Sequence, residues 1–202
     1  MEPEEAIALS SRVVDLVATS DLRMALITGS VARGLADAAS DLDIYLYWDR
    51  LDRTELAEPQ RFDPIGARVA FGVPTAHGWF TKLDLDGQYV DVESVDATVL
   101  EHARDALNAG DAPPGWVVKL AAGVRDAIAV RGAEQLAVWQ QRFVYTDESA
   151  TAEVTTRAPR LLSPTALFEL AYTRGDILGF TARLSRVLLD SRAVKLRMSP
   201  RV

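Results

Sequence analysis

The chain has 202 residues, a formal net charge of −7 and no cysteine. This length fits one domain, or a domain with a small second module, and is ample for a hydrophobic core. The lack of cysteine excludes disulfides, thiolate metal sites and cysteine nucleophiles. The acidic balance argues against a nucleic-acid partner, and no run of residues is apolar for long enough to predict a membrane partner. Since the acidic start is unlike a secretory signal, we expect a cytoplasmic protein.

The first half of the chain predicts an alternation of helices and strands. The elements expected from apolar spacing are a helix over 3–20, a buried strand over 23–28, the opening of a helix at 31–35, a strand over 41–48, a helical turn at 54–58, strands over 67–71, 79–85 and 88–95, and a helix over 96–109. The strands over 79–85 and 88–95 flank Asp86-Gly87, a strong hairpin signal.

The second half has a different character, which begins at the pair Pro113-Pro114. Helical spacing extends over 116–131, 134–145 and 164–189, so we expect a helical C-terminal domain over 113–202 after a mixed α and β domain over 1–112. The fold class is therefore predicted to be α+β, a mixed sheet with flanking helices and a helical module. The basic tail after Leu189 breaks the apolar spacing and is expected to be a poorly ordered extension.

One segment combines a tight turn with a pair of carboxylates. Gly29-Ser30 follows a predicted strand and opens a helix, so its backbone N–H groups and the Ser30 hydroxyl offer a site for an anion, with Arg33 close by. Asp41 and Asp43 are two residues apart on the next strand, so both side chains point to the same face. Their repulsion amounts to about 1 kcal/mol or more, and a divalent cation such as Mg²⁺ relieves it.

The predicted hairpin supplies a third carboxylate. In the run Tyr-Val-Asp-Val-Glu at 89–93, the acids alternate with valines, so Asp91 and Glu93 share a face. If this strand pairs beside the strand of Asp41 and Asp43, one of the two acids completes a two-metal site of the kind that clamps both oxygens of a phosphoryl displacement. That acid also suits the removal of a proton from an attacking hydroxyl. The residue pattern leaves open which of Asp91 and Glu93 is that acid.

The two parts of this pattern, Gly29-Ser30-Val31-Ala32-Arg33-Gly34 and Ser40-Asp41-Leu42-Asp43, closely resemble the signature of the DNA polymerase β-like nucleotidyltransferase superfamily. Its members include aminoglycoside and lincosamide nucleotidyltransferases and minimal nucleotidyltransferase antitoxins. The resemblance implies a nucleotidyltransferase-type mixed sheet and transfer of a nucleoside monophosphate, in the first place AMP from ATP or else from another NTP, with two Mg²⁺ ions and release of pyrophosphate. It implies nucleotide binding by Gly29, Ser30, Arg33 and Ser40, metal binding by Asp41, Asp43 and Asp91, and catalysis by Asp41, Asp43 and Asp91 or Glu93.

The acceptor has no recognisable motif, because acceptor pockets depend on loops and added modules. The acidic surface suits a small cationic hydroxylated acceptor such as an aminoglycoside-like antibiotic, which would make the protein an antibiotic-resistance enzyme. One alternative is an antitoxin-like protein that binds or modifies a partner toxin. Another is a catalytically silent nucleotide-binding relative, which the intact pair Asp41 and Asp43 argues against. The apolar helices expected after Pro113 also fit a homodimer.

Overall fold

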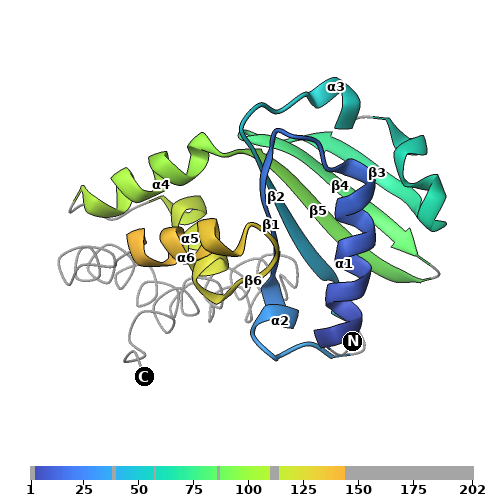
Figure 1. The fold of residues 1–202 in the computed structure, drawn as a ribbon, viewed down its shortest axis with the longest axis horizontal. Helices are drawn as coiled ribbons and strands as arrows, with labels where there is room; N and C mark the ends of the chain where they lie inside the picture. Colours follow the sequence, from blue (N-terminus) through green and yellow to red (C-terminus); the bar gives the residue numbers. More distant parts are fainter. Residues whose placement is uncertain (1–2, 38–39, 57, 86, 110–113, 144–202) are drawn as a thin grey trace, which may run out of the picture. The chain divides into compact units, whose positions relative to one another are not determined.

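The computed structural model describes residues 3–37, 40–56, 58–85, 87–109 and 114–143 (Figure 1). Six helices, one 3-10 helix (η1) and six strands are found in these residues. In chain order they are α1 (Pro3–Val17), β1 (Leu22–Thr28), α2 (Gly29–Ala32), β2 (Leu42–Trp48), α3 (Arg53–Leu56), η1 (Pro59–Ile65), β3 (Arg68–Pro74), β4 (Gly78–Leu85), β5 (Gln88–Asp96), α4 (Thr98–Asn108), α5 (Gly115–Asp126), β6 (Ile128–Arg131) and α6 (Ala133–Arg142).

The strands form one six-stranded sheet in the order β3-β4-β5-β2-β1-β6. Neighbouring strands are antiparallel except for β2 and β5, which are parallel. The predicted α+β class, a mixed sheet with flanking helices, is therefore confirmed. The hairpin predicted between the strands over 79–85 and 88–95 is also confirmed, because β4 and β5 are antiparallel and Leu85 pairs with Gln88.

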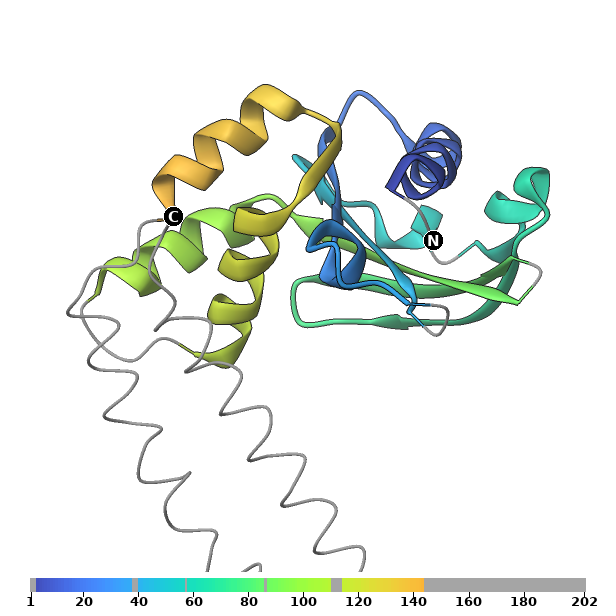
Figure 2. The same cartoon turned by 90° about the horizontal axis from the view of Figure 1, so that it is seen from below.

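The main core lies between the sheet and α1, which lies over one face of the sheet (Figures 1 and 2). The apolar stripe Val13, Val14 and Val17 packs there with alternate residues of β1 and β2 such as Ile27 and Ile44, all nearly inaccessible to solvent. On the opposite face, Tyr47 near the far end of β2 is also buried, whereas Asp43 at its beginning is only half-buried. The beginning of β2 is therefore where that face reaches solvent.

The prediction of a helix over 116–131 is wrong in its last part. α5 ends at Asp126, and Ile128–Arg131 forms β6, which pairs with β1. Ile128 and Val130 are β-branched and alternate along the chain, which favours a strand when a sheet edge offers backbone partners. β1 offers that edge, so the backbone groups of 128–131 are satisfied in the sheet instead of in a helix.

The chain divides into two compact units, one of residues 1–104 and 119–143, and the other of residues 105–118 with residues beyond 143. The predicted boundary between 1–112 and 113–202 stays a prediction. The helix expected over 164–189 and the basic tail after Leu189 lie outside the described residues. None of the described helices combines the length and the apolar character that a bilayer crossing requires.

Candidate active site

The register of the parallel strands β2 and β5 brings the predicted acids together. Asp43 of β2 lies directly opposite Asp91 of β5, and residues in register share a face of the sheet. Asp41 comes just before β2 and lies on the same side of the chain as Asp43. The two carboxylates of the motif and the acid of the hairpin are therefore neighbours, although almost fifty residues separate Asp43 from Asp91 in the sequence.

A lysine that the sequence analysis missed holds two of these acids. The Nζ of Lys82 donates hydrogen bonds to Asp41 Oδ2 at 2.8 Å and to Asp91 Oδ1 at 2.9 Å. Its side chain is 22% exposed and Nζ lies 5.1 Å from the centroid of the Tyr89 ring. The turn at Asp86-Gly87 was the signal that could have found it, because a two-residue turn sets the register that places Lys82 opposite Asp91.

Gly29 and Asp43 are in direct contact, which joins the two halves of the motif. Gly29 follows β1 and opens α2 with φ +70°, a left-handed conformation that favours glycine. A Cβ placed on Gly29 would overlap Asp43 Oδ2 and would lie 2.8 Å from its Cγ. Thr28, the preceding residue, pairs with Asp43 in the sheet. Only a residue without a side chain therefore lets the Asp43 carboxylate occupy its present position.

Burial and like charge both act on Asp43. Its partial burial raises the pKa of the carboxyl above its ordinary value, and the negative charges of Asp91 and Asp41 raise it further. The positive charges of Lys119 and Arg33 lower the same pKa and so oppose this effect. Lys119, on α5, is a second cation near the acids that the sequence analysis did not single out. Acids with raised pKa values beside basic side chains are typical of functional sites.

Glu93 lies on the same face as Asp91 but one pair further along the sheet. Glu93 pairs with Tyr45 of β2 and with Phe80 of β4. Burial raises the pKa of the Glu93 carboxyl, and Lys119 lowers it in part. Asp91, in contrast, lies opposite Asp43 and shares Lys82 with Asp41. The geometry thus places Asp91, rather than Glu93, beside both acids of the motif.

The remaining predicted nucleotide-binding residues lie in and after α2. Ser30 is half-buried, and its carbonyl accepts a hydrogen bond from the Leu35 N–H at 2.9 Å. Arg33 is half-buried and near enough to Asp43 to lower the pKa of its carboxyl. The Ser40 hydroxyl donates to Asp37 Oδ1 at 2.9 Å and accepts from the Asp37 N–H at 3.0 Å. Ser40 therefore closes the loop that leads into Asp41.

Beyond Lys82, the same face of the sheet becomes apolar and exposed. Phe71 and Val73 of the edge strand β3 lie opposite Lys82 and Phe80, and their side chains are 48% and 43% exposed. The rings of Phe71 and Phe80 are 5.7 Å apart between centroids. Exposed aromatic and apolar groups beside a polar cluster are typical of a surface that receives a ligand or a partner.

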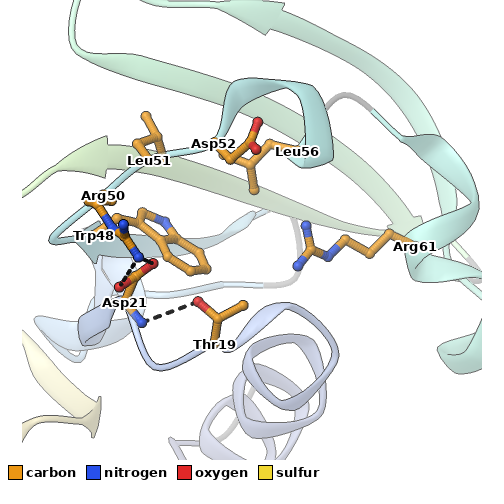
Figure 3. Close-up of a pocket in the computed structure, with 8 residues that line it drawn as sticks. All are labelled: Thr19, Asp21, Trp48, Arg50, Leu51, Asp52, Leu56 and Arg61. Carbon is orange, nitrogen blue, oxygen red and sulfur yellow. Dashed lines mark hydrogen bonds and ion pairs between the residues drawn. The ribbon is translucent and has the colours of Figure 1, made fainter.

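A cavity of about 480 Å³ lies elsewhere, at the other end of β2 (Figure 3). It is lined by Thr19, Asp21, Trp48, Arg50, Leu51, Asp52, Leu56 and Arg61. Trp48 ends β2 and points to the face that carries α1, whereas Asp43 is near the beginning of β2 and points to the opposite face. Within the lining, Arg50 Nη2 lies 3.1 Å from Asp21 Oδ2. The acids of the motif are therefore outside this cavity, and we take their cluster as the candidate active site.

The donor atoms suit a hard divalent cation, since they are carboxylate oxygens. Asp41 and Asp91 already converge on one cation, the Lys82 ammonium, which shows that both can reach the same point. Within the described part of the chain, however, no group of three or more acidic, histidine or cysteine side chains stands ready to hold a metal ion. The chemistry of the residues fits Mg²⁺, and the Lys82 ammonium occupies the point at which Asp41 and Asp91 converge.

The chain matches no family model and no curated protein. Among solved structures, a nucleotidyltransferase-like protein from Exiguobacterium sibiricum 255-15 is similar over 96% of this chain, with 13% sequence identity and a TM-score of 0.38. The similar region covers 59% of that protein, so the present chain spans less than two thirds of its length. A likeness this low carries no argument about function, which therefore rests on the residues themselves.

Proposed function

We propose that this protein is a nucleotidyltransferase that moves a nucleoside monophosphate, in the first place AMP from ATP, to the hydroxyl of an acceptor. One observation carries the proposal. The acids Asp41, Asp43 and Asp91 meet at one end of β2, and Asp43 is held against Gly29, the glycine of the phosphate-binding turn. This is the arrangement that the resemblance to the DNA polymerase β-like superfamily implies for its motif.

The residues of the site would divide the work as follows. The backbone at Gly29 and the Ser30 hydroxyl would bind the phosphates that leave as pyrophosphate. The acceptor oxygen would attack the α-phosphorus, the bond from that phosphorus to the oxygen that bridges to the β-phosphate would break, and Asp91 would take the hydroxyl proton. Mg²⁺ held by Asp41, Asp43 and Asp91 would neutralise the charge that develops on the phosphoryl oxygens.

The choice of Asp91 as the third acid can be tested against Glu93. Asp91 is in register with Asp43, whereas Glu93 is in register with Tyr45 and lies one pair further from the phosphate-binding turn. We therefore expect Asp91→Asn to lower transfer by about 100-fold or more, and Glu93→Gln to lower it by less than about tenfold. Equal losses in the two variants, or a greater loss in Glu93→Gln, would reverse the assignment.

The central experiment is a transfer screen. Nucleoside triphosphates labelled at the α-phosphate are incubated with Mg²⁺ and either hydroxylated small molecules, including aminoglycosides, or proteins of a cell extract. We expect a labelled small molecule, and we expect Asp43→Asn to lose this labelling while Asp15→Asn, an exposed change on α1, keeps it. Full labelling by Asp43→Asn, with the same Mg²⁺ dependence, would contradict the proposed mechanism.

A second candidate is favoured by the edge of the sheet. β3 is an outer strand of the sheet, and Phe71 and Val73 are exposed on it, so that an extended segment of a partner protein could pair there. This agrees with the antitoxin-like alternative, in which the acceptor is a toxin protein. In the same screen, a labelled protein whose labelling is lost in Phe71→Glu would support this candidate. A labelled small molecule whose labelling survives in Phe71→Glu would contradict it.

A further inference from the structure

Lys82 stands between two acids that the proposed function assigns to a divalent metal ion. We propose that Lys82 is the resident cation of this cluster, and that a divalent ion binds Asp41 and Asp91 only by displacing the Lys82 ammonium group. The inference rests on the proposed function, because that function supplies the reason for a divalent ion at these acids. It concerns the binding of the ion, so it can fail or succeed independently of nucleotide transfer.

The two contacts of Lys82 are short and directed. Its Nζ lies 2.8 Å from Asp41 Oδ2 and 2.9 Å from Asp91 Oδ1, distances that are typical of charge-assisted hydrogen bonds. The side chains of Lys82 and Asp91 are 22% and 24% exposed, so water screens this pair less than it screens surface pairs. One ammonium therefore neutralises charge on both acids.

The backbone of Lys82 is positioned by the hairpin, and its ammonium group has a third neighbour besides the two acids. Lys82 lies opposite Asp91 in the antiparallel pair β4 and β5, and its Nζ lies 5.1 Å from the centroid of the Tyr89 ring. The antiparallel register of the hairpin fixes where the stem begins, and the ring face adds a cation–π attraction. Lys82 thus has a defined position between the acids.

A divalent ion and this ammonium compete for the same oxygens. Mg²⁺ binds oxygens at about 2.0–2.1 Å in an octahedral arrangement, and the ammonium takes one oxygen of each acid. An ion that both acids hold at the point where Lys82 lies would break both contacts of Lys82, which would lower the apparent affinity of the site for the metal. The displaced ammonium then needs another anion, and the phosphates of a nucleoside triphosphate that arrives with the metal can supply it.

The test measures binding of Mn²⁺ alone to the full-length chain, by isothermal titration calorimetry and in the absence of nucleotide. We expect Lys82→Met to bind Mn²⁺ about tenfold more tightly than the unmodified protein. Lys119→Met is the matched control, since it also removes one positive charge near the acids, where Lys119 lowers the pKa of both Asp43 and Glu93. It should tighten binding by less than about threefold, because an exposed charge is well screened.

The comparison between the two variants separates displacement from general attraction. A tenfold gain in Lys82→Met with a small gain in Lys119→Met supports the proposal. Equal gains in both variants, or no gain in a folded Lys82→Met, overturn it, and so does the absence of measurable Mn²⁺ binding in that variant. If binding behaves as expected but no acceptor is ever labelled, the proposed function fails while this inference stands.

A second measurement uses the unmodified protein, so it does not depend on how a variant folds. Lysine amines are acylated briefly with acetic anhydride, with and without saturating Mn²⁺, and the modified peptides are quantified by mass spectrometry. Displacement of Lys82 from its two acids should increase its acylation several-fold when Mn²⁺ is added, while that of Lys119 changes little. Unchanged or reduced acylation of Lys82 in the presence of bound Mn²⁺ would overturn the proposal.

Discussion

The contact between Gly29 and Asp43 predicts the effect of a single added methyl group. In Gly29→Ala, the new Cβ would overlap Asp43 Oδ2 and lie 2.8 Å from Cγ and 3.3 Å from the Cβ of Asp43. The backbone of residue 29 also has φ +70°, which disfavours any residue with a side chain. Two separate penalties are therefore expected, one from the backbone and one from the displaced carboxylate.

The expected magnitude follows from these two parts. A left-handed conformation costs an alanine about 1–2 kcal/mol. Movement of the Asp43 carboxylate out of its half-buried place adds about as much again, typical of overpacking. We therefore expect Gly29→Ala to lower the free energy of unfolding by about 3 kcal/mol, which for a chain of this size lowers Tm by roughly 6–12 °C. Transfer activity should fall further than stability explains, because Asp43 is moved.

Gly34→Ala is the matched control for the backbone penalty. Gly34 has φ +65°, but a Cβ on it would meet no atom within 4 Å. Its variant should lose only about 1–2 kcal/mol. Urea unfolding, monitored by tryptophan fluorescence, compares the two variants. The same measurement is made on Gly29→Ala in an Asp43→Ala background, where the loss of unfolding free energy should fall to the value for Gly34→Ala. The reasoning is refuted if Gly29→Ala costs no more than Gly34→Ala, or if removing the Asp43 carboxylate leaves the penalty unchanged.

Three further predictions concern burial, capping and the core. Burial raises the pKa of Glu93, so its ionised carboxylate disfavours folding once the pH rises above the ordinary pKa of glutamate. Glu93→Gln should therefore have a higher Tm than the unmodified protein at pH 7 and an equal Tm near about pH 4. A difference in Tm that grows on acidification would contradict this. Asp96 Oδ1 accepts hydrogen bonds from the N–H and the hydroxyl of Thr98 at the start of α4, and these bonds lower the pKa of the Asp96 carboxyl. Asp96→Ala should therefore lower the free energy of unfolding, measured in urea, by about 1 kcal/mol at pH 7 and by less as the pH falls through the range in which aspartate is protonated. Ile44 is fully buried in the main core, so Ile44→Ala should lose about 3 kcal/mol by the same measurement, and a loss below about 1 kcal/mol would show that its surroundings collapse around the cavity.

Local patterns determined most of the elements around the site. The apolar runs that became β1 and β2, and the Asp86-Gly87 turn between β4 and β5, depend on neighbours in the sequence, so they could be predicted from it. A two-residue turn at that position also predicts the register that sets Lys82 opposite Asp91. The alternation of acids and valines in β5 likewise predicted that Asp91 and Glu93 share a face.

What only the tertiary structure decided is how β5 meets β2. Their pairing is parallel and joins residues distant in the sequence, and its register puts Asp91 rather than Glu93 opposite Asp43. A shift of two residues would keep every valine in the core and exchange the two acids, so the hydrophobic pattern could not choose between them. For the same reason the sequence did not predict β6, because its residues form a strand only where β1 offers them an edge. Nor did it predict the role of Lys119, whose charge acts on Asp43 only in the folded chain.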